Sequence, residues 1–218
     1  MVIIKFQGGL GNQMFQYALY RKLQLSGKAV FADVSRYHQE NERNWDLCKF
    51  GLKVMEADAD DIKRLNDCQR DFISRVRRKI WVKRSCYKER ENGRFFPEVL
   101  KNDNVYLDGY WQTEKYFSDI RGQIINDFSF FDFGTDSEKI YENLIDDAGD
   151  HSVSIHIRRG DYCNHIMAPI YGGICTLDYY KCAIQFIMER VENPVFFVFS
   201  NDIQWVKDNL KGIRCTYV

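Results

Sequence analysis

The feature that most limits the possible folds of this chain is its opening, where a strand passes through a glycine-rich turn into a helix. Residues 2–6 (VIIKF) are apolar enough for a buried strand, and QGGLGNQ follows at once at residues 7–13. Asn12 is a suitable N-cap for a helix that continues toward Gly27. Its apolar stripe at helical spacing consists of Phe15, Leu19 and Leu23, with Met14 and Ala18 beside them. Such strand–turn–helix units build parallel α/β sheets.

The same order of strand and helix recurs in the middle of the chain. Residues 29–33 predict a second strand, and residues 152–157 (SVSIHI) alternate apolar and polar side chains as a half-buried strand does. Residues 116–126 and 137–147 predict helices, the second with Ser137 as its N-cap. The sequence therefore predicts an α/β fold with parallel sheets.

Another such unit follows near the end of the chain. Thr176 is a suitable N-cap for a helix that ends before Pro194, and residues 195–199 predict a buried strand. One face of that helix carries Tyr180, Ala183, Ile184, Ile187, Met188 and Val191. The strand delivers Ser200, Asn201 and Asp202 to the edge where open α/β sheets bind ligands.

A polar stretch at residues 146–151, which contains Gly149, separates the two halves of the chain. We place a domain boundary there, which gives one domain at residues 1–148 and a second at residues 149–218. Residues 215–218 (CTYV) have the pattern of a strand that has only begun.

The first glycine turn has the chemistry of an anion or sugar-nucleotide site. Gly9 and Gly11 allow a ligand to approach the backbone, and N–H groups at a helix start point toward negative charge. A turn that only connects strand and helix is equally compatible with these residues. Gly9-x-Gly11 with Asp33 also resembles a dinucleotide fingerprint, but Met14 occupies the third glycine position. A nicotinamide- or flavin-dependent oxidoreductase is thus an open alternative.

A pair of arginines follows the strand at residues 152–157, within the segment HIRRGDY at residues 156–162. Adjacent guanidiniums are costly to desolvate without an anion, and their planar forks match phosphate oxygens. Arg158 and Arg159 therefore suit a diphosphate. The structural alternative is an exposed arginine pair with an ion pair to Asp161.

Composition narrows the function classes. A formal net charge of zero gives no support to nucleic-acid binding, which needs a basic face. Seven scattered cysteines, an odd number without a C-x-x-C pair, indicate a reducing compartment rather than a disulfide framework. His156, Cys163 and His165 match no common metal site, and Asp58-Ala59-Asp60 lies in an expected helical turn, so no metal is predicted. The apolar opening is too short for a signal peptide or a membrane span.

Residues 63–90 differ in character from the rest of the chain. They hold eleven basic and three acidic residues around a narrow apolar stripe, which predicts an amphipathic helix. This helix either presents a solvated cationic face or makes weak contact with an anionic membrane surface.

Three segments together resemble the bacterial α-1,2-fucosyltransferases, which are GDP-fucose-dependent inverting glycosyltransferases. They are GGLGNQMFQYA at residues 8–18, LDGYWQTEKYF at 107–117 and HIRRGDY at 156–162, with support from FVFSNDIQWVK at 197–207. The resemblance implies a GT-B arrangement, in which two Rossmann-like domains with parallel sheets face a cleft and the second domain binds GDP-fucose. The family continues with further βα elements, so we expect that the second domain is incomplete in this chain, and its activity uncertain.

The same resemblance implies roles for individual residues. Arg158 is the main ligand of the donor β-phosphate, and Arg159 supports the geometry of the motif. His156 and Asp202 contact guanosine, since a carboxylate accepts two parallel hydrogen bonds from guanine. A strand histidine and a helix-capping aspartate are the structural alternatives for these two. Asn12 faces the pyrophosphate or the acceptor hydroxyl.

The implied reaction moves L-fucose from GDP-β-L-fucose to the 2-hydroxyl of a galactose-containing oligosaccharide or lipid-linked glycan, with inversion. Arginine and backbone N–H groups stabilise the departing diphosphate, so we expect no cofactor and no divalent ion. Asp161 and His165 are the two candidates for the general base, and the choice between them is open. The expected location is the bacterial cytoplasm, peripherally at the inner face of the membrane. An inactive sugar-nucleotide-binding fragment is a further alternative.

Overall fold

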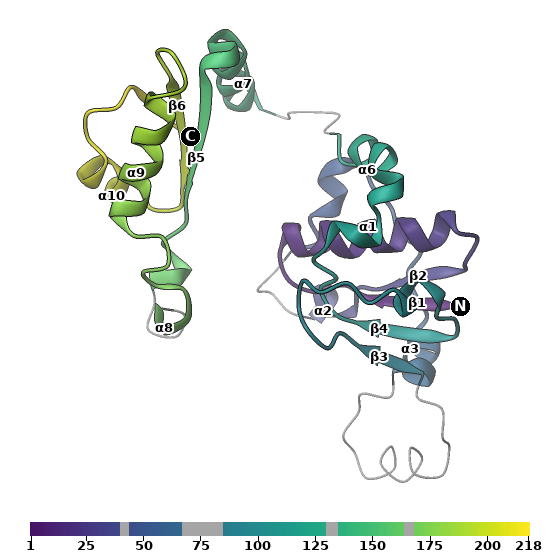
Figure 1. Cartoon of the computed structure of the whole chain (residues 1–218). Helices are drawn as coiled ribbons and strands as arrows, with labels where there is room; N and C mark the ends of the chain where they lie inside the picture. Colours follow the sequence, from purple (N-terminus) through teal and green to yellow (C-terminus); the bar gives the residue numbers. More distant parts are fainter. Residues whose placement is uncertain (40–43, 67–84, 130–134, 164–167) are drawn as a thin grey trace. The chain divides into compact units, whose positions relative to one another are not determined.

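The computed structural model of the chain describes residues 1–39, 44–66, 85–129, 135–163 and 168–218. It divides the chain into two units, Met1–Asp132 and Phe133–Val218 (Figure 1). The division comes earlier than the expected boundary after residue 148, because helix α7 (Asp136–Ala148) contacts strand β5 (Ser152–Ile157) and groups with the second unit.

The first unit contains a four-stranded sheet in which every pair of neighbours is parallel. Its order is β2-β1-β4-β3, with β1 at Val2–Lys5, β2 at Val30–Asp33, β3 at Cys86–Lys88 and β4 at Val105–Asp108. The chain passes from β1 to β2 on one side, while β4 pairs with β1 on the other. The loops after β1 and β4 therefore meet where the strand order reverses, which is the usual ligand position in open α/β sheets.

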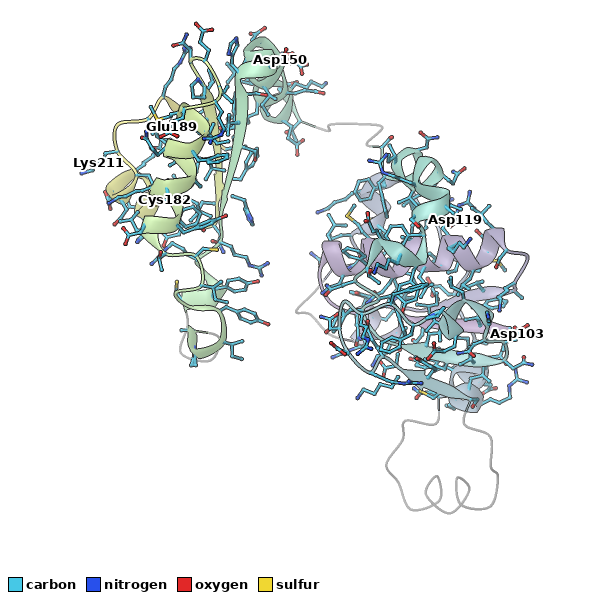
Figure 2. The ribbon with its side chains drawn as sticks, in the orientation of Figure 1. Asp103, Asp119, Asp150, Cys182, Glu189 and Lys211 are labelled. Atoms are coloured by element: carbon cyan, nitrogen blue, oxygen red, sulfur yellow. The ribbon has the colours of Figure 1, made fainter. Side chains whose placement is uncertain are left out.

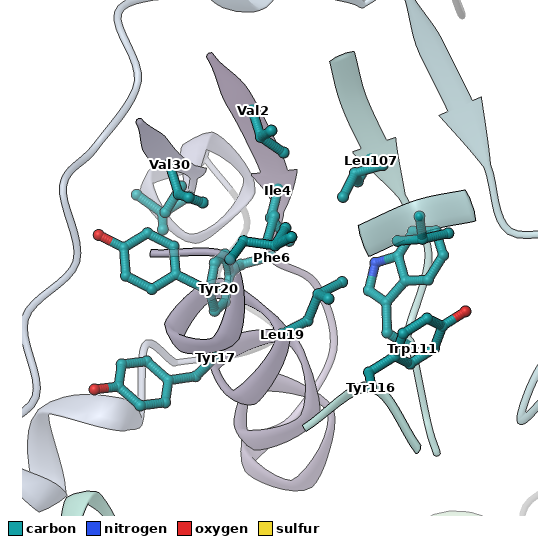
Figure 3. Close-up of a cluster of buried hydrophobic side chains, with 14 of the residues drawn as sticks. Val2, Ile4, Phe6, Tyr17, Leu19, Tyr20, Val30, Leu107, Trp111 and Tyr116 are labelled. Atoms are coloured by element: carbon teal, nitrogen blue, oxygen red, sulfur yellow. The ribbon is translucent and has the colours of Figure 1, made fainter. Parts of the chain in front are cut away.

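Both faces of this sheet are covered. Helix α1 (Leu10–Leu25) contacts β1 and β2, and α3 (Ala59–Leu65) contacts β4. The larger core, shown in Figure 3, contains Val2, Ile4, Phe6, Tyr17, Leu19, Tyr20, Leu107, Trp111 and Tyr116. A smaller cluster of Ile3, Leu65 and Tyr106 lies on the opposite face of the sheet. Each large side chain of this kind contributes about 1.5–3 kcal/mol when it leaves water.

Helix α1 ends just before Gly27, as the sequence predicts. Gly27 has φ +84°, and its N–H donates to the Gln24 carbonyl, while the Lys28 N–H donates to the Leu23 carbonyl. This pair of bonds is a Schellman motif, which needs a residue that tolerates the left-handed conformation. The start of the helix differs from prediction, since Gly9 and not Asn12 is its N-cap and α1 begins at Leu10.

Shorter elements complete the first unit. They are helices α2 (Ser35–Gln39), α5 (Glu98–Lys101) and α6 (Arg121–Asp127), and 3₁₀ helices η1 (Leu47–Phe50), η2 (Glu114–Tyr116) and η3 (Ser118–Ile120). The single helix predicted at residues 116–126 is thus three pieces, because the chain bends at Phe117. Most of the basic segment at residues 63–90 lies outside the described residues. The helix predicted over all of it is wrong at its C-terminal end, because residues 86–88 form strand β3 and pair with β4. Asp103 and Asp119 mark the outer surface of the unit (Figure 2).

The second unit has a three-stranded parallel sheet of order β5-β6-β7, with β6 at Val195–Ser200 and β7 at Cys215–Tyr217. Helices α9 (Leu177–Met188) and α10 (Ile203–Asn209) supply core side chains that pack with Ile157, Phe196 and Val198. The 3₁₀ helices η4 (Gly149–His151) and η5 (Asp161–Cys163) and helix α8 (Ala168–Tyr171) connect these elements. Figure 2 shows Glu189 and Lys211 on its surface.

Capping in the second unit follows the prediction at one helix and departs from it at another. The Thr176 side chain accepts a hydrogen bond from the Tyr179 N–H, as expected for the start of α9. Helix α7 is capped by Thr135 rather than Ser137, because Thr135 and Glu138 form a reciprocal capping box. Met188, predicted for the buried face of α9, is half exposed at 50%.

The parallel α/β fold predicted from the sequence is confirmed in both units. The cleft of a GT-B arrangement stays a prediction. Within the described ranges, no helix is both long and apolar enough to span a bilayer.

Candidate functional site

The predicted arginines lie in a turn at residues 158–160, here called the arginine turn, which follows the end of β5. Ile157 of β5 pairs in register with Ser200 of β6, so Asn201 reaches the turn from the neighbouring strand end. Its Oδ1 accepts the backbone N–H groups of Arg159 and Gly160 at 2.9 and 3.2 Å. A Cβ on Gly160 would lie 2.4 Å from Asn201 Nδ2, so a larger residue would have to displace the Asn201 side chain. The turn is therefore fixed by a carboxamide before any ligand binds.

Arg159 is held by internal partners. Its Nε donates to Asp202 Oδ2 at 3.2 Å, and its Cζ lies 4.1 Å from the centroid of the Trp205 ring. Asp202 also caps α10, because its Oδ1 accepts the Trp205 N–H at 3.2 Å. Ser200 Oγ in turn accepts the Asp202 N–H at 3.0 Å. These contacts hold the Arg159 side chain within the unit, and its role in supporting the motif stays a prediction.

Arg158 has a different environment. The residue is exposed, and its guanidinium Cζ lies 4.5 Å from the centroid of the Tyr162 ring. Tyr162 itself stacks on Tyr171, with ring centroids 4.7 Å apart and an angle of 18° between the planes. Stacking occupies the face of a guanidinium, while its N–H donors lie in the plane and point outward.

A pocket of about 330 Å³ lies beside both arginines, a volume at the lower end of ordinary ligand sites. Its walls are aromatic, cationic and thiol side chains together with a glycine pair, namely His156, Arg158, Arg159, Tyr162, Cys163, Tyr171, Gly172, Gly173, Ile174, Cys175, Tyr180 and Trp205. A second pocket of about 260 Å³ shares His156, Cys175 and Tyr180 with it and is otherwise more apolar. Burial raises the pKa of Tyr180, so this wall of the pocket keeps its phenol protonated.

The predicted site residues of this unit separate into two groups. His156, Arg158 and Arg159 line the larger pocket, whereas Ser200 and Asp202 lie behind it in the hydrogen-bond network described above. Asp202 thus has the helix-capping role that was its structural alternative, while His156 is exposed on its strand. Their contacts with guanosine stay predictions. The Asp161 side chain and all of His165 lie outside the described part of the chain.

The glycine turn of the first unit, residues 7–9, depends on Gly8 for its shape, while Gly9 in the turn and Gly11 in the first turn of α1 are left open. Gly8 has φ +85°, and a Cβ there would lie 2.2 Å from Asn12 Nδ2. By contrast, apart from the adjacent backbone, no atom of the described residues lies within 4 Å of a Cβ placed on Gly9 or Gly11. Packing within the described structure therefore explains Gly8 but not Gly9 or Gly11, and open backbone at these two is what close approach of a ligand requires.

Buried carboxamides hold the glycine turn in place. Gln16 accepts the Gln7 N–H at 3.0 Å and donates to the carbonyls of Gln7 and Gly109 at 3.2 and 3.3 Å. Gln13 donates to the carbonyls of Gly8 and Asn44 at 3.1 and 2.9 Å and accepts the Asp46 N–H at 2.9 Å. Both side chains are fully buried. Their partners lie in loops far apart in the sequence, so the motif organises several loops at one sheet edge.

Two further contacts complete this edge. Gln112 Nε2 donates to Asn12 Oδ1 at 2.6 Å, which joins the first turn of α1 to the loop after β4 where the strand order reverses. The Tyr37 hydroxyl donates to the Gly8 carbonyl at 2.9 Å, and burial raises the pKa of Tyr37 to about 12. Asn12 is thus part of an amide pair and not the cap of α1.

The loop after β4 is strained. Trp111 is fully buried with φ +57°, a left-handed conformation that is costly for a large side chain. The Glu89 carboxylate compensates by accepting the N–H groups of Tyr110 at 2.6 Å and Trp111 at 3.2 Å. Gly109 permits this approach, since its Cβ would lie 2.6 Å from the Cβ of Glu89.

Asp33, the ribose-binding residue of the oxidoreductase alternative, is engaged inside the protein. It is buried, its Oδ2 accepts the Tyr106 hydroxyl at 2.6 Å, and its Oδ1 accepts the Ser35 N–H at 3.0 Å. Burial, with Asp33 as hydrogen-bond partner, raises the pKa of Tyr106. These contacts leave the carboxylate poorly placed for a nucleotide. Among the described residues, no three His, Cys, Asp or Glu side chains gather into a metal-binding group, and Asp58 only precedes α3, as expected.

Comparison with known proteins decides the family. The sequence profile described as "Glycosyl transferase family 11" matches residues 1–218, the whole chain. The chain belongs to glycosyl transferase family 11.

Family 11 relatives come from bacteria and mammals. The Escherichia coli "Alpha-1,2-colitosyltransferase" is 30% identical over 95% of this chain and 71% of its own length. The E. coli "O-antigen biosynthesis glycosyltransferase WbnK" is 29% identical over 97% of this chain and 76% of its own length. The rat "Galactoside alpha-(1,2)-fucosyltransferase 2" is 25% identical over 98% of this chain and 55% of its own length. No solved structure matches the chain.

Several residues of this family 11 site were not singled out from the sequence. Asn201 was placed at the strand edge but given no role, and Gln13, Gln16 and Gln112 were only part of a quoted motif. A signal for the glutamines existed, since Gln13 and Gln16 lie on the helix stripe beside Leu19 and Leu23, where polar residues need buried partners. Tyr171 lies outside every motif, and nothing in its sequence neighbourhood marks it.

Proposed function

We propose that this family 11 protein moves L-fucose from GDP-β-L-fucose to the 2-hydroxyl of a terminal β-galactoside, with inversion to the α-1,2 linkage. The observation that carries the proposal is the 330 Å³ pocket at the ends of parallel strands, with Arg158 on an aromatic stack and Arg159 fixed behind it. The α-1,2 linkage is named for relatives at 25–30% identity. Because one relative is named for colitose, a colitose donor is the second candidate.

In the proposed reaction, the acceptor oxygen attacks the anomeric carbon while the bond from that carbon to the diphosphate oxygen breaks. The electron pair leaves with GDP, and the hydroxyl proton passes to a base, for which Asp161 and His165 are the candidates. Arg158 stabilises the charge that develops on the diphosphate, so it contributes more in the transition state than in the ground state. We propose that this arginine replaces a divalent ion.

The first unit is the proposed acceptor side. The Asn12–Gln112 amide pair lies beside the open backbone of Gly9 and Gly11. Carboxamides donate and accept at once, which suits them to sugar hydroxyls. We therefore assign these residues to the acceptor sugar or the diphosphate, in agreement with the role implied for Asn12 by the family motif.

The test is transfer from GDP-fucose and from a colitose donor to lactose, with and without EDTA, with the product linkage read by NMR. We expect an α-1,2-linked product that forms in EDTA. Arg158→Ala should abolish transfer, while Arg190→Ala should not, although Arg190 also stacks on an aromatic ring, that of Phe186 at 3.5 Å. Loss of activity in EDTA that Mg²⁺ restores would overturn the metal-free step. Flavin or nicotinamide absorbance in the purified protein would favour the oxidoreductase instead.

A further inference from the structure

We infer that Glu89 is a positioning residue for the acceptor side of the first unit, where it holds the loop after β4 so that Gln112 meets Asn12. The inference rests on the proposed function and extends it to a residue outside the motifs quoted above. Glu89 directly follows strand β3, and its backbone N–H donates to the Asp108 carbonyl at 2.9 Å. Its side chain therefore starts from a fixed point at the same sheet edge as the proposed acceptor residues.

The loop after β4, residues 109–113, is held at its backbone from two sides. On one side, the Glu89 carboxylate accepts the N–H groups of Tyr110 at 2.6 Å and of Trp111 at 3.2 Å. On the other side, Gln16 Nε2 donates to the Gly109 carbonyl at 3.3 Å. Because Gln16 also binds the backbone of the glycine turn, Glu89 is the one of the two side chains that can be changed without removing a contact to that turn.

The conformation that Glu89 holds is one that the loop would not adopt from local preference. Trp111 has φ +57°, which is costly for a residue with a large side chain. Its indole Nε1 is buried and has no hydrogen-bond partner among the described residues, which is a second cost. A carboxylate that accepts two adjacent N–H groups makes strong, charge-assisted hydrogen bonds that offset these costs. Loss of the Glu89 carboxylate should therefore let the loop relax.

The held conformation determines where Gln112 lies. The Thr113 N–H donates to the Trp111 carbonyl at 2.8 Å, which makes a three-residue turn with Gln112 at its centre. From there, Gln112 Nε2 reaches Asn12 Oδ1 at 2.6 Å, in the first turn of α1. Gln112 directly follows the two residues that Glu89 binds, so its direction depends on them. A carboxamide recognises a sugar hydroxyl well when its direction is fixed, and Glu89 provides that constraint.

The first measurement needs no ligand. In ¹⁵N-labelled protein, the side-chain amide resonances of Gln112, assigned by their loss in Gln112→Ala, should be shifted by the bond to Asn12 from the values of a solvated glutamine. We expect Glu89→Gln to move them toward those values, because a carboxamide has one acceptor oxygen and its NH₂ group would oppose a backbone N–H of the loop. Glu89→Asp, which keeps both acceptor oxygens on a shorter side chain, should give an intermediate shift.

The second measurement is the affinity of the full chain for lactose, read from a chemical-shift titration. Glu89→Gln should raise the Kd about 3- to 10-fold, as expected for the loss of one well-placed hydrogen bond. It should leave the Kd for GDP, measured by calorimetry, within about twofold. In a Gln112→Ala background the same change should raise the Kd for lactose less than about twofold, because Glu89 acts through Gln112.

The matched control is Glu91→Gln, because Glu91 lies two residues further along and accepts a hydrogen bond from the exposed Arg94 side chain at 3.0 Å. It should change none of these values. Unchanged Gln112 resonances in Glu89→Gln, or an additive effect in the Gln112→Ala background, overturns the positioning role while the proposed function stands. A loss of GDP affinity in place of lactose affinity overturns the acceptor-side assignment. Failure of the wild type to bind lactose and GDP, with the Gln112 resonances still sensitive to Glu89→Gln, overturns the proposed function and with it the acceptor role of this loop.

Discussion

The glycine turn of the first unit and the arginine turn of the second occupy equivalent places, each directly after the first strand of a parallel sheet. In both, a side-chain carboxamide fixes the backbone, Gln16 in the first and Asn201 in the second. The residues presented to a ligand differ. The first turn shows neutral amides and bare backbone, whereas the second shows guanidiniums and aromatic rings.

Within each motif, the residues that hold the turn in place are thus different from the residues that are available to contact a ligand. The carboxamides bury their polar atoms in hydrogen bonds to backbone and serve as scaffold. The groups left at the surface determine the ligand, which under the proposed function is a neutral hydroxyl-bearing sugar for the first turn and a diphosphate for the second. The comparison predicts that scaffold changes lower stability or displace the turn that they hold, and that surface changes lower binding or transfer directly.

The largest expected effect is at Arg158. Arg158→Lys should lower the transfer rate about 100-fold or more, since a point-charge ammonium does not reproduce a planar fork on the diphosphate. Initial rates with saturating GDP-fucose measure this loss, and calorimetry with GDP measures the ground-state part. Arg190→Lys is the control, because Arg190 also contacts an aromatic ring but lies outside the pocket. Equal rates for wild type and Arg158→Lys would remove Arg158 from the site.

Gln16 tests the scaffold of the first turn. Gln16→Leu leaves the N–H and carbonyl of Gln7 and the carbonyl of Gly109 without their buried partner. We expect a loss of about 2–3 kcal/mol in the free energy of unfolding, measured by urea titration, from the cost of unsatisfied buried groups. Gln123→Leu, at an exposed glutamine that donates to Asp127, should cost less than about 0.5 kcal/mol. GDP affinity should stay unchanged, and a selective loss of GDP binding would contradict the division of roles.

The fold was largely predictable from the sequence, while much of the site was not. Hydrophobic period identified β1, β5 and β6 and their helices, because a period of two or of 3.6 residues directly reflects which side chains are buried. Arg158 and Arg159 were predictable as a pair from their chemistry. What separates their roles is Asp202 and Trp205 on one side and Tyr162 and Tyr171 on the other, contacts that only the folded chain brings together.

The N-caps predicted for α1 and α7 were wrong for a related reason. Asn12 and Ser137 each have the right residue type for an N-cap, but the actual caps, Gly9 and Thr135, lie earlier in the chain. Asn12 is already bonded to Gln112, and Thr135 has the reciprocal capping partner Glu138. Local propensity allows several positions, and the surrounding contacts select one.

Gly160 and Asn201 test the scaffold of the second turn. Gly160→Ala should raise the Kd for GDP about tenfold, because its Cβ would lie 2.4 Å from Asn201 Nδ2 and displace the turn. In an Asn201→Gly background the same change should cost less than about threefold, since the obstructing side chain is gone. Calorimetry on wild type, the two single variants and the double variant gives the interaction free energy between Gly160 and Asn201. Simple additivity would show that Asn201 does not hold the turn.

Substitutions at Gly8 and Gly9 distinguish two properties of the glycine turn, the conformation of its backbone and the access that it gives to a ligand. Gly8→Ala should destabilise the fold by about 1–2 kcal/mol, because φ is +85° and Asn12 obstructs the new Cβ. Gly9→Ala should leave stability within about 0.5 kcal/mol, since its Cβ meets nothing within 4 Å, and should instead raise the KM for the acceptor. Thermal melts and acceptor titrations measure the two quantities. A Gly9→Ala protein with normal acceptor kinetics would show that no ligand approaches there.

The smallest expected effect is a difference in alkaline stability between the two turns. Burial raises the pKa of Tyr37 to about 12, above the ordinary value near 10. Below pH 10 the phenol is protonated in both folded and unfolded chains, and its bond to the Gly8 carbonyl is intact. Between pH 10 and 12 the unfolded chain releases this proton while the folded chain keeps it, so stability falls as pH rises.

The Tyr37 hydroxyl bonds to the glycine turn, so substitution of Tyr37 tests the pH effect at that turn. The measurement is the urea midpoint at pH 9 and pH 11 for wild type, Tyr37→Phe and Tyr179→Phe, the last an exposed tyrosine on α9. Other buried tyrosines, Tyr106 among them, add the same background to all three proteins. We expect the drop to be smaller in Tyr37→Phe than in the other two. An equal drop in all three would mean that the Tyr37 hydroxyl does not stabilise the glycine turn.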